Sequence, residues 1–529
     1  MKKLNNIFKF FVYLLPFALV FSYYPVIQFG SDGAMNFELS VPLIWLVGFD
    51  VFGLGLLFYR DGFRKVFQEI FRNWKWLLFP SFLTLSCAWS PNIVRGILTV
   101  GILWLIYLAG FLFYNFRKLY DENFKRKFLK AFFGASVFIC IVLVLQCILD
   151  LVGVSREYTL MCAGCTYRSF GFPHPNGFAI EPQFMGNLLL APMLVVAWKT
   201  IQLKSQNDVL RDGVAPARRY GGRAPRYLGR NLRSALKTSF LALFIMAFVL
   251  FLTFSRGAIY AVMIGLVVLS IANLPKRLAR DTLKAVRPSL WSRAKRFRSI
   301  GILWLTVILS FLFTLNLQGV MAEVSKTDDT YVSGVAKVLN HLSLGVIDIR
   351  GEKTGENERE EKTLEIVGAG EMVELDDLSE GAGEAVELNE ILEEEGKEEA
   401  YFDGYVAEST DVRVGMTGAA VRTWQKDFRT ILIGTGLGGA GIAMYENGET
   451  EWSKEIVQNQ YASLLLETGV VGISLLIFSL WLIIRIILKQ KQAGLIFALM
   501  VAYGISLFFF SGLPNVLHIY LLVPLSMCM

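Results

Sequence analysis

The stretch FLALFIMAFVLFLTFSRGAIYAVMIGLVVLSIAN, residues 240–273, is an apolar run with a single charge, Arg256, at its middle. A membrane-spanning helix needs about twenty apolar residues, so this run fits two spans of about seventeen residues better than one. Basic segments flank it on both sides, residues 211–237 and 275–298. Because loops rich in Lys and Arg stay in the cytoplasm, we expect the chain to cross twice and to turn at Ser255-Arg256-Gly257 on the outer face.

Arg256 is therefore the first candidate functional residue. An arginine side chain keeps its proton, and placing it at membrane depth costs a few kcal/mol or more, so an intramembrane arginine is a functional hypothesis by default. At the predicted turn its guanidinium would lie level with the lipid phosphates of the outer leaflet. The alternative is a structural arginine that reaches the interface along its aliphatic stem or pairs with another residue.

The remainder of the chain has the composition of an integral membrane protein. Of its 529 residues, 54% are hydrophobic, and the mean hydropathy is +0.48. Apolar runs of this length and number predict an all-α bundle of about twelve transmembrane helices. The expected spans lie near residues 8–28, 41–59, 75–89, 97–114, 130–152, 184–198, 238–254, 257–274, 299–317, 465–486, 493–510 and 514–528.

The basic loops predict the orientation of this bundle. The chain begins Met-Lys-Lys, and further basic segments lie at 59–75, 115–127 and 489–492. If both termini are cytoplasmic, all of these fall inside the cell, and residues 153–183 and 318–464 fall outside. The net charge of +7 is thus explained by topology and indicates no nucleic-acid partner. The N-terminal run has no small-residue cleavage site, so we interpret it as a retained span in the cytoplasmic membrane rather than a signal peptide.

The predicted organisation has three parts: spans one to nine in residues 1–317, a large extracytoplasmic loop domain in 318–464, and spans ten to twelve in 465–529. Within the loop, residues 351–400 are strongly acidic and lack aromatic residues, which is typical of a disordered or loosely helical insert; an acidic cation site is the alternative. Residues 411–464 are expected to fold. The apolar residues there recur at helical spacing: Ala420, Val421, Trp424, Phe428 and Ile431. This spacing indicates an amphipathic helix, which lies either on the membrane surface or in solvent.

One cysteine pattern and one glycine pattern in the predicted outer segments each allow more than one interpretation. Cys162-Ala-Gly-Cys165 lacks a second ligand pair nearby, so a short disulfide or two idle thiols fit better than zinc. Gly436-Leu-Gly-Gly-Ala-Gly441 matches a dinucleotide-binding pattern, but it faces the outside and follows no βαβ pattern. We interpret it as a flexible turn beneath a substrate.

Four stretches, in order, resemble conserved segments of one family. They are RSFGFPHPNGFA at 168–179, TFSRGA at 253–258, STDVRVGMTGAAVRTW at 409–424 followed by ILIGTGLGGAG, and QNQYASLLLETGVVG at 458–472. Together with the long loop before the tenth span, they resemble the O-antigen ligase and O-antigen polymerase family of bacterial envelope proteins. The match covers about a fifth of the chain.

The resemblance implies a glycosyltransferase that needs no metal and no cofactor. Its donor would be a glycan on a polyprenyl diphosphate, and its acceptor would be a hydroxyl group of a glycan, lipid or protein. The enzyme would also contact the surrounding membrane lipids. Arginines neutralise a departing diphosphate best where water is scarce, because they bind phosphate oxygens with two parallel hydrogen bonds. The resemblance assigns catalytic roles to Arg168, Arg256, Glu467 and Gln458, and substrate binding to Arg413, Arg422, Asn459, Tyr461, Asn176 and His174.

One position departs from the family pattern. The family carries a histidine where this chain has Gln458, and glutamine cannot accept a proton at neutral pH. Either Gln458 only orients a sugar hydroxyl, or another group is the base; Glu467 and His174 are the candidates. The rival function is a flippase or transporter of lipid-linked sugars, which should place charges near the bilayer midplane in two repeated halves. No internal repeat of that kind is visible in the sequence.

Overall fold

We describe the fold from a computed structural model of the chain. The described residues are 1–21, 25–29, 37–151, 175–179, 182–211, 226–273, 290–324, 331–344, 405–453, 455–490, 492–509 and 517–528. Four predicted features lie outside them: Arg168, His174, the Cys162 and Cys165 pair, and the acidic segment 351–400.

Long apolar helices dominate the described part of the chain, which confirms the prediction of a helical membrane protein. Nine of these helices are long and apolar enough to cross a bilayer. They are α1 (Lys2–Val20), α2 (Val41–Asp61), α5 (Ile93–Asn115), α6 (Glu122–Leu151), α7 (Pro182–Arg211), α9 (Arg226–Leu252), α10 (Arg256–Asn273), α11 (Leu290–Val324) and α17 (Gln460–Ile487).

The predicted third, eleventh and twelfth spans coincide with shorter helices. These are α4 (Leu78–Ser86), which continues as a 3-10 turn to Trp89, α18 (Ala493–Ser506) and α19 (Leu517–Cys528). The longest of them, α18, has 14 residues and is about 21 Å long, whereas the hydrocarbon core is about 30 Å thick. The crossing of the membrane by these three segments stays a prediction.

The first span differs from the sequence-based expectation. Helix α1 ends at Val20, and Pro25–Phe29 forms strand β1, paired antiparallel with β2 (Phe37–Ser40). Proline has no N–H group and disfavours helical backbone in the residue before it, so Pro25 cannot continue the helix. Hydropathy alone extended the span across this hairpin, because the strand residues are also apolar.

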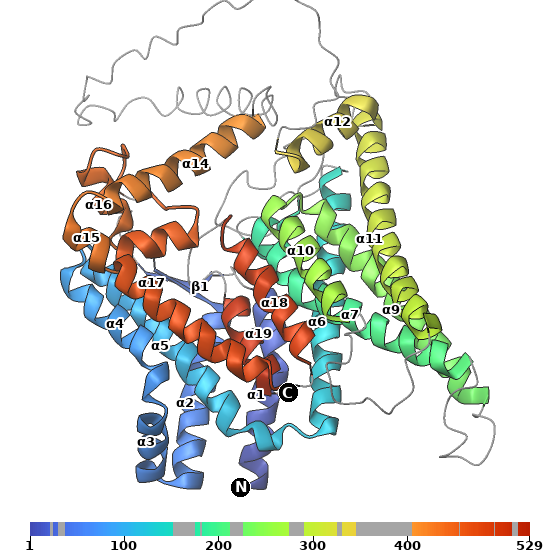
Figure 1. The fold of residues 1–529 in the computed structure, drawn as a ribbon, viewed down its shortest axis with the longest axis horizontal. Helices are drawn as coiled ribbons and strands as arrows, with labels where there is room; N and C mark the ends of the chain where they lie inside the picture. The colour runs from blue at the N-terminus through green and yellow to red at the C-terminus, as the bar shows by residue number, and fades with distance from the viewer. Residues whose placement is uncertain are drawn as a thin grey trace, which may run out of the picture.

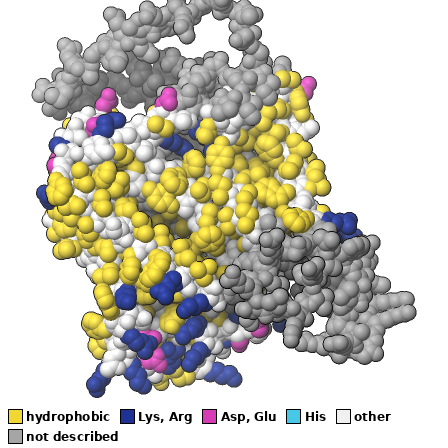
Figure 2. All heavy atoms as spheres, in the orientation of Figure 1, with side chains coloured by type: hydrophobic (Ala, Val, Ile, Leu, Met, Phe, Trp, Pro, Cys, Tyr) yellow, Lys and Arg dark blue, Asp and Glu magenta, His cyan; other side chains and the backbone are white. Residues whose placement is uncertain are grey.

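The helices stand side by side in a bundle, and the two ends of the bundle differ (Figure 1). The short helices α12 (Tyr331–Leu342), α14 (Tyr405–Trp424), α15 (Phe428–Ile433) and α16 (Ala440–Glu446) gather at one end, which we call the cap end. The N-terminus lies at the opposite end, beside the amphipathic helix α3 (Phe63–Arg72). Figure 2 shows Lys and Arg side chains concentrated there, below a broad hydrophobic belt, and we call it the basic end.

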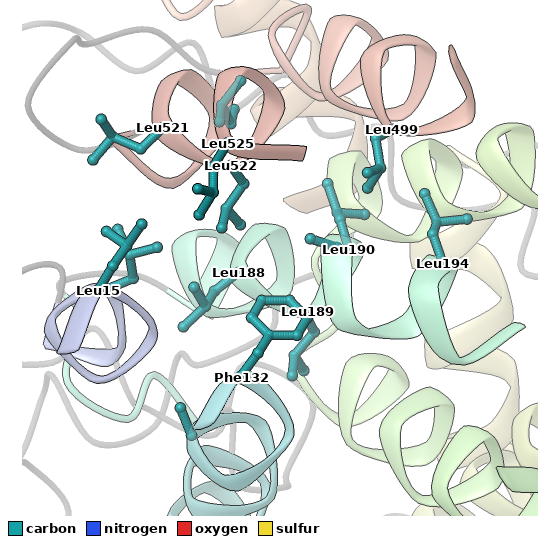
Figure 3. Close-up of a cluster of buried hydrophobic side chains, with 14 of the residues drawn as sticks. Leu15, Phe132, Leu188, Leu189, Leu190, Leu194, Leu499, Leu521, Leu522 and Leu525 are labelled. Carbon is teal, nitrogen blue, oxygen red and sulfur yellow. The ribbon is translucent and has the colours of Figure 1, made fainter. Parts of the chain in front are cut away.

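Helix α7 forms the centre of the bundle. In its most apolar window 83% of the residues are buried, against 17% for α17, which therefore faces the surroundings of the bundle. Figure 3 shows how leucines of α7 meet side chains from four other helices, α1, α6, α18 and α19. The labelled residues are Leu15, Phe132, Leu188, Leu189, Leu190, Leu194, Leu499, Leu521, Leu522 and Leu525.

The amphipathic helix predicted around residues 420–431 is broken in two. Helix α14 ends at Trp424, and α15 begins at Phe428. The Asp427 side chain accepts a hydrogen bond from the Thr430 amide at 2.8 Å, which is an N-cap and therefore starts a new helix. Ala420 is buried as the pattern predicted, but Phe428 is 75% exposed, because it belongs to the second helix.

Candidate functional site

Arg256 lies at the start of α10, in a tight turn that joins α9 to α10 at the cap end. The chain turns where the sequence predicted. Phe254 takes up a left-handed conformation with φ 46°, and the Ser255 hydroxyl accepts a hydrogen bond from the Ala258 amide at 3.4 Å. The arginine side chain is only 6% exposed. A cation is therefore enclosed by protein at the end of a hairpin of two apolar helices.

Two other helices close on this turn through glycines. A β-carbon on Gly186 of α7 would lie 2.8 Å from the Ala258 side chain, and one on Gly257 would lie 2.7 Å from Phe509, just after α18. The Gln183 amide group donates a hydrogen bond to the Phe509 carbonyl oxygen at 3.1 Å. The start of α7, the Arg256 turn and the residues just after α18 are thus in close contact.

Short helices of the cap lie over the Arg256 turn. Arg256 Nη1 is 3.4 Å from the Thr410 hydroxyl of α14. A ring nitrogen of His341 in α12 lies 3.0 Å from the Phe254 carbonyl oxygen, and the Tyr260 hydroxyl donates to the Leu342 carbonyl. The loop that separates α11 from α17 in the sequence therefore returns to the hairpin that contains Arg256.

The Gln458–Gly472 segment begins α17, and its first turn also packs on the end of α18. The Asn459 side chain caps the helix by accepting from the amides of Tyr461 and Ala462, at 3.0 and 3.2 Å. The Tyr461 hydroxyl donates to the Gly504 carbonyl at 2.7 Å, and its ring centroid is 4.5 Å from that of Phe508. The structure thus brings two predicted motifs, at Arg256 and Tyr461, to Phe509 and Phe508, which are adjacent residues just after α18.

Glu467 lies two turns further along α17, against the glycine-rich loop. The Gly436 amide donates to the Glu467 carbonyl at 2.9 Å, and the amides of Gly438 and Ala440 bond to its side-chain carboxyl group. The side chain remains partly exposed. The loop predicted to be a turn beneath a substrate therefore fixes the position of a carboxylate, which sequence reasoning did not foresee.

Several other predicted site residues have structural partners. Arg422, with a side chain 60% exposed, forms an ion pair with Glu449, at 2.6 Å between Nη2 and Oε2. This guanidinium holds the pKa of the Glu449 carboxyl below its ordinary value. Asn176 is buried, and its side-chain oxygen accepts from Gln146 of α6 at 2.8 Å. Gln458 is exposed, and Arg413 is partly exposed on α14.

Arg95 was missed by the sequence reasoning. It lies in the first turn of α5, its charge acts on the Glu467 carboxyl, and its side chain would contact a β-carbon on Gly438 at 3.2 Å. The available signal was the same as for Arg256: a single arginine at one end of an apolar span, here in SPNIVRGILTV.

Comparison with models of known protein families, with curated proteins and with solved structures finds no match to this chain.

Proposed function

We propose that the protein transfers glycans from a polyprenyl-diphosphate donor to an acceptor hydroxyl at the outer face of the cytoplasmic membrane. The observation that carries the proposal is the enclosed Arg256 at the cap end of an apolar hairpin. A diphosphate at the membrane surface is the anion that such a cation would neutralise. Arg256 also lies in one of the four stretches that resemble the O-antigen ligase and polymerase family.

Arg256 would act on the leaving group. When the bond between the anomeric carbon and the diphosphate oxygen breaks, the electron pair stays on the diphosphate, and negative charge develops there. The planar guanidinium can bind two phosphate oxygens at once. The N-terminus of α10 adds a further positive potential, since Arg256 is the first residue of that helix. Both effects are strongest where water is excluded.

Glu467 is the candidate base for the acceptor. The hydroxyl oxygen of the acceptor would bond to the anomeric carbon while its proton passes to the Glu467 carboxylate. The amides of Gly438 and Ala440 hold this carboxylate in place. It lies six residues beyond Tyr461, or about 9 Å along the helix, so a glycan that extends from the Arg256 turn past Tyr461 would reach it.

The cap end would be the extracytoplasmic side. Lys and Arg gather at the opposite end (Figure 2), and loops rich in these residues stay in the cytoplasm. With this orientation both termini are cytoplasmic, and the segment between α11 and α17 lies outside.

Reconstitution in proteoliposomes with a labelled polyprenyl-diphosphate glycan tests the proposal. We expect the label to move to a new acceptor or into a longer glycan, and this transfer to fail in Arg256→Ala. Movement of intact donor between leaflets without a covalent product would instead identify a flippase and reject the glycosyltransferase assignment.

A further inference from the structure

The glycine-rich loop, residues 434–441, connects the first turn of α5 to α17. On one side the Gly436 amide donates a hydrogen bond to the Glu467 carbonyl oxygen at 2.9 Å. On the other side Gly438, with φ 81°, packs so closely on α5 that a β-carbon there would lie 2.8 Å from the Gly96 amide nitrogen. Backbone contacts on both sides of the loop therefore fix the first turn of α5 relative to Glu467.

Arg95 lies in this first turn of α5. Its backbone amide donates to the side chain of Asn92, the N-cap of the helix, at 3.1 Å. Its side chain lies 3.2 Å from the β-carbon position of Gly438, and the Gly438 amide bonds to the Glu467 carboxyl group. Arg95 and Glu467 form no direct ion pair among the described residues, so the charge of Arg95 acts on the carboxyl group through space.

Both side chains border a large, mostly apolar cavity between α5, α17, α18 and α19. Its volume is about 1850 Å³. Four charged residues of the described chain line this cavity: Arg95, Arg117, Glu455 and Glu467. Arg117 follows the far end of α5, where its guanidinium lies 3.8 Å from the centroid of the Tyr114 ring. Arg95 is therefore the cation of the cavity wall at the cap end.

The other titratable groups around Glu467 do not supply a positive charge. The Cys87 thiol, in the 3-10 turn after α4, and the Tyr461 hydroxyl are neutral at neutral pH, and both donate to backbone carbonyl groups. Glu455 is the other acidic side chain in the wall, and a like charge would disfavour ionisation of Glu467. Helices α4, α14, α15, α16 and α18 also pack on α17, but their described residues place no charged side chain in this wall.

A carboxyl group in an apolar wall is costly to ionise, because burial disfavours the charged form. A base must nevertheless be ionised in order to accept a proton. Two features of the site favour the carboxylate of Glu467: hydrogen bonds from the amides of Gly438 and Ala440, and the cation Arg95. The amides belong to the backbone, so Arg95 is the contribution that a side-chain substitution can remove.

We propose that Arg95 is a positioning residue, which keeps Glu467 ionised so that it can take the proton of the acceptor hydroxyl. This inference rests on the proposed function, in which the acceptor oxygen bonds to the anomeric carbon and the diphosphate leaves with the electron pair. The proton then resides on Glu467. The charge of Arg95 favours release of this proton to water, which restores the carboxylate for the next turnover, and Arg95 itself binds no substrate.

Infrared spectroscopy of the full-length protein in detergent tests the coupling, with the side-chain carboxyl of glutamate labelled with carbon-13. The band of a protonated carboxyl group that disappears in Glu467→Gln identifies the signal of Glu467. In Arg95→Gln we expect this band to persist to a pH about one unit or more higher than in wild type, because an opposite charge has been removed. Arg95→Lys should titrate as wild type does, since only the charge is needed.

Arg429→Gln is the matched control. It removes an exposed arginine from the cap end, outside the cavity, and should leave the Glu467 band unchanged. Turnover gives a second measurement: in Arg95→Gln the pH at which transfer begins should rise by the same interval, and activity should recover in alkaline solution. A purely structural role of Arg95 would instead lower transfer at every pH.

Two results would overturn the inference: titration of Glu467 at the same pH in Arg95→Gln and wild type, or a shift in Arg95→Lys as large as in Arg95→Gln. The infrared measurement involves no sugar transfer. A shifted band in a protein that forms no product would therefore support the coupling of Arg95 to Glu467 and count against the proposed function alone. Transfer by the wild type together with an unshifted band in Arg95→Gln would reject the coupling and leave the proposed function standing.

Discussion

Gly469 of α17 packs directly on the backbone of Leu432 in α15: a β-carbon on Gly469 would lie 2.5 Å from the Leu432 carbonyl oxygen. The same glycine has φ 61° and kinks α17 just after Glu467. The contact joins the cap to the membrane helix that carries the candidate base, and the left-handed backbone is the reason that glycine is required there.

Gly469→Ala should lower the stability of the protein. The left-handed backbone alone costs a side chain about 1–3 kcal/mol, and the contact with Leu432 adds to this. The control Gly101→Ala, in the interior of α5 with no neighbour within 4 Å, should be neutral or stabilising by up to about 1 kcal/mol. Thermal unfolding in detergent measures both. Equal melting temperatures for the two variants would mean that α15 does not bind the kink.

Arg256→Lys should lose most of the transfer activity and remain inserted and folded. Lysine keeps the charge but not the planar fork that binds two phosphate oxygens. A lost charge-assisted hydrogen bond is worth about 1.5–3 kcal/mol, or roughly tenfold to a hundredfold in rate. Arg298→Lys, at an exposed position of α11, is the control and should behave as wild type. Full activity of Arg256→Lys would show that a simple counter-charge is enough.

Glu467→Gln tests the base without changing shape. The amide keeps the size of the carboxyl group but cannot accept a proton, and general-base catalysis typically contributes two to four powers of ten in rate. We expect a loss of that order and a changed pH profile of turnover. Gln458→Ala should cost less than Arg256→Ala, and Gln458→His should be tolerated, because Gln458 is exposed and cannot be the base. An unchanged pH profile in Glu467→Gln would direct the search to His174.

The Arg422–Glu449 pair should weaken in acid. Arg422 holds the pKa of the Glu449 carboxyl below its ordinary value of 4.5. A lowered pKa in the folded state means that the pair stabilises the fold above pH 4.5, and that this contribution disappears as the pH falls through the lower folded value. Hydrogen exchange of residues 447–453, corrected for intrinsic rates, should rise in that range. In Arg422→Gln the exchange should already be raised at neutral pH; exchange equal to wild type would show that the pair is not formed.

Cysteine labelling tests the orientation of the bundle. In a background in which the six native cysteines are replaced by serine, Glu451→Cys at the cap end should react with an impermeant maleimide added outside intact cells. Ser234→Cys, in the exposed part of α9 at the basic end, should react only after the membrane is opened. The opposite pattern would invert the topology and with it the proposed function.

The positions of the long membrane helices followed from the sequence alone. Hydropathy and chain length are local properties, and a run of apolar residues must form a helix in a membrane because its backbone groups have no water to bond. The turn at Arg256 was predictable from local sequence as well, because this single charge divides an apolar run that is too long for one span. The prediction from local sequence was wrong at two places. At Pro25 apolar strand residues were assigned to a helix, and at Asp427 an N-cap divides a segment that was predicted as one helix.

The neighbours of each site residue were decided only by tertiary structure. Gln183, Gly257 and Tyr461 are far apart in the sequence, and all three contact residues 504–509, the end of α18 and the turn after it, which carry no motif. Which helix packs beside which depends on side-chain shape summed over the whole bundle, and glycines such as Gly186 and Gly257 permit approaches that no periodicity reveals. The pairing of Arg422 with Glu449 and the cavity beside Arg95 arise in the same way, from contacts between segments that hydropathy treats as independent.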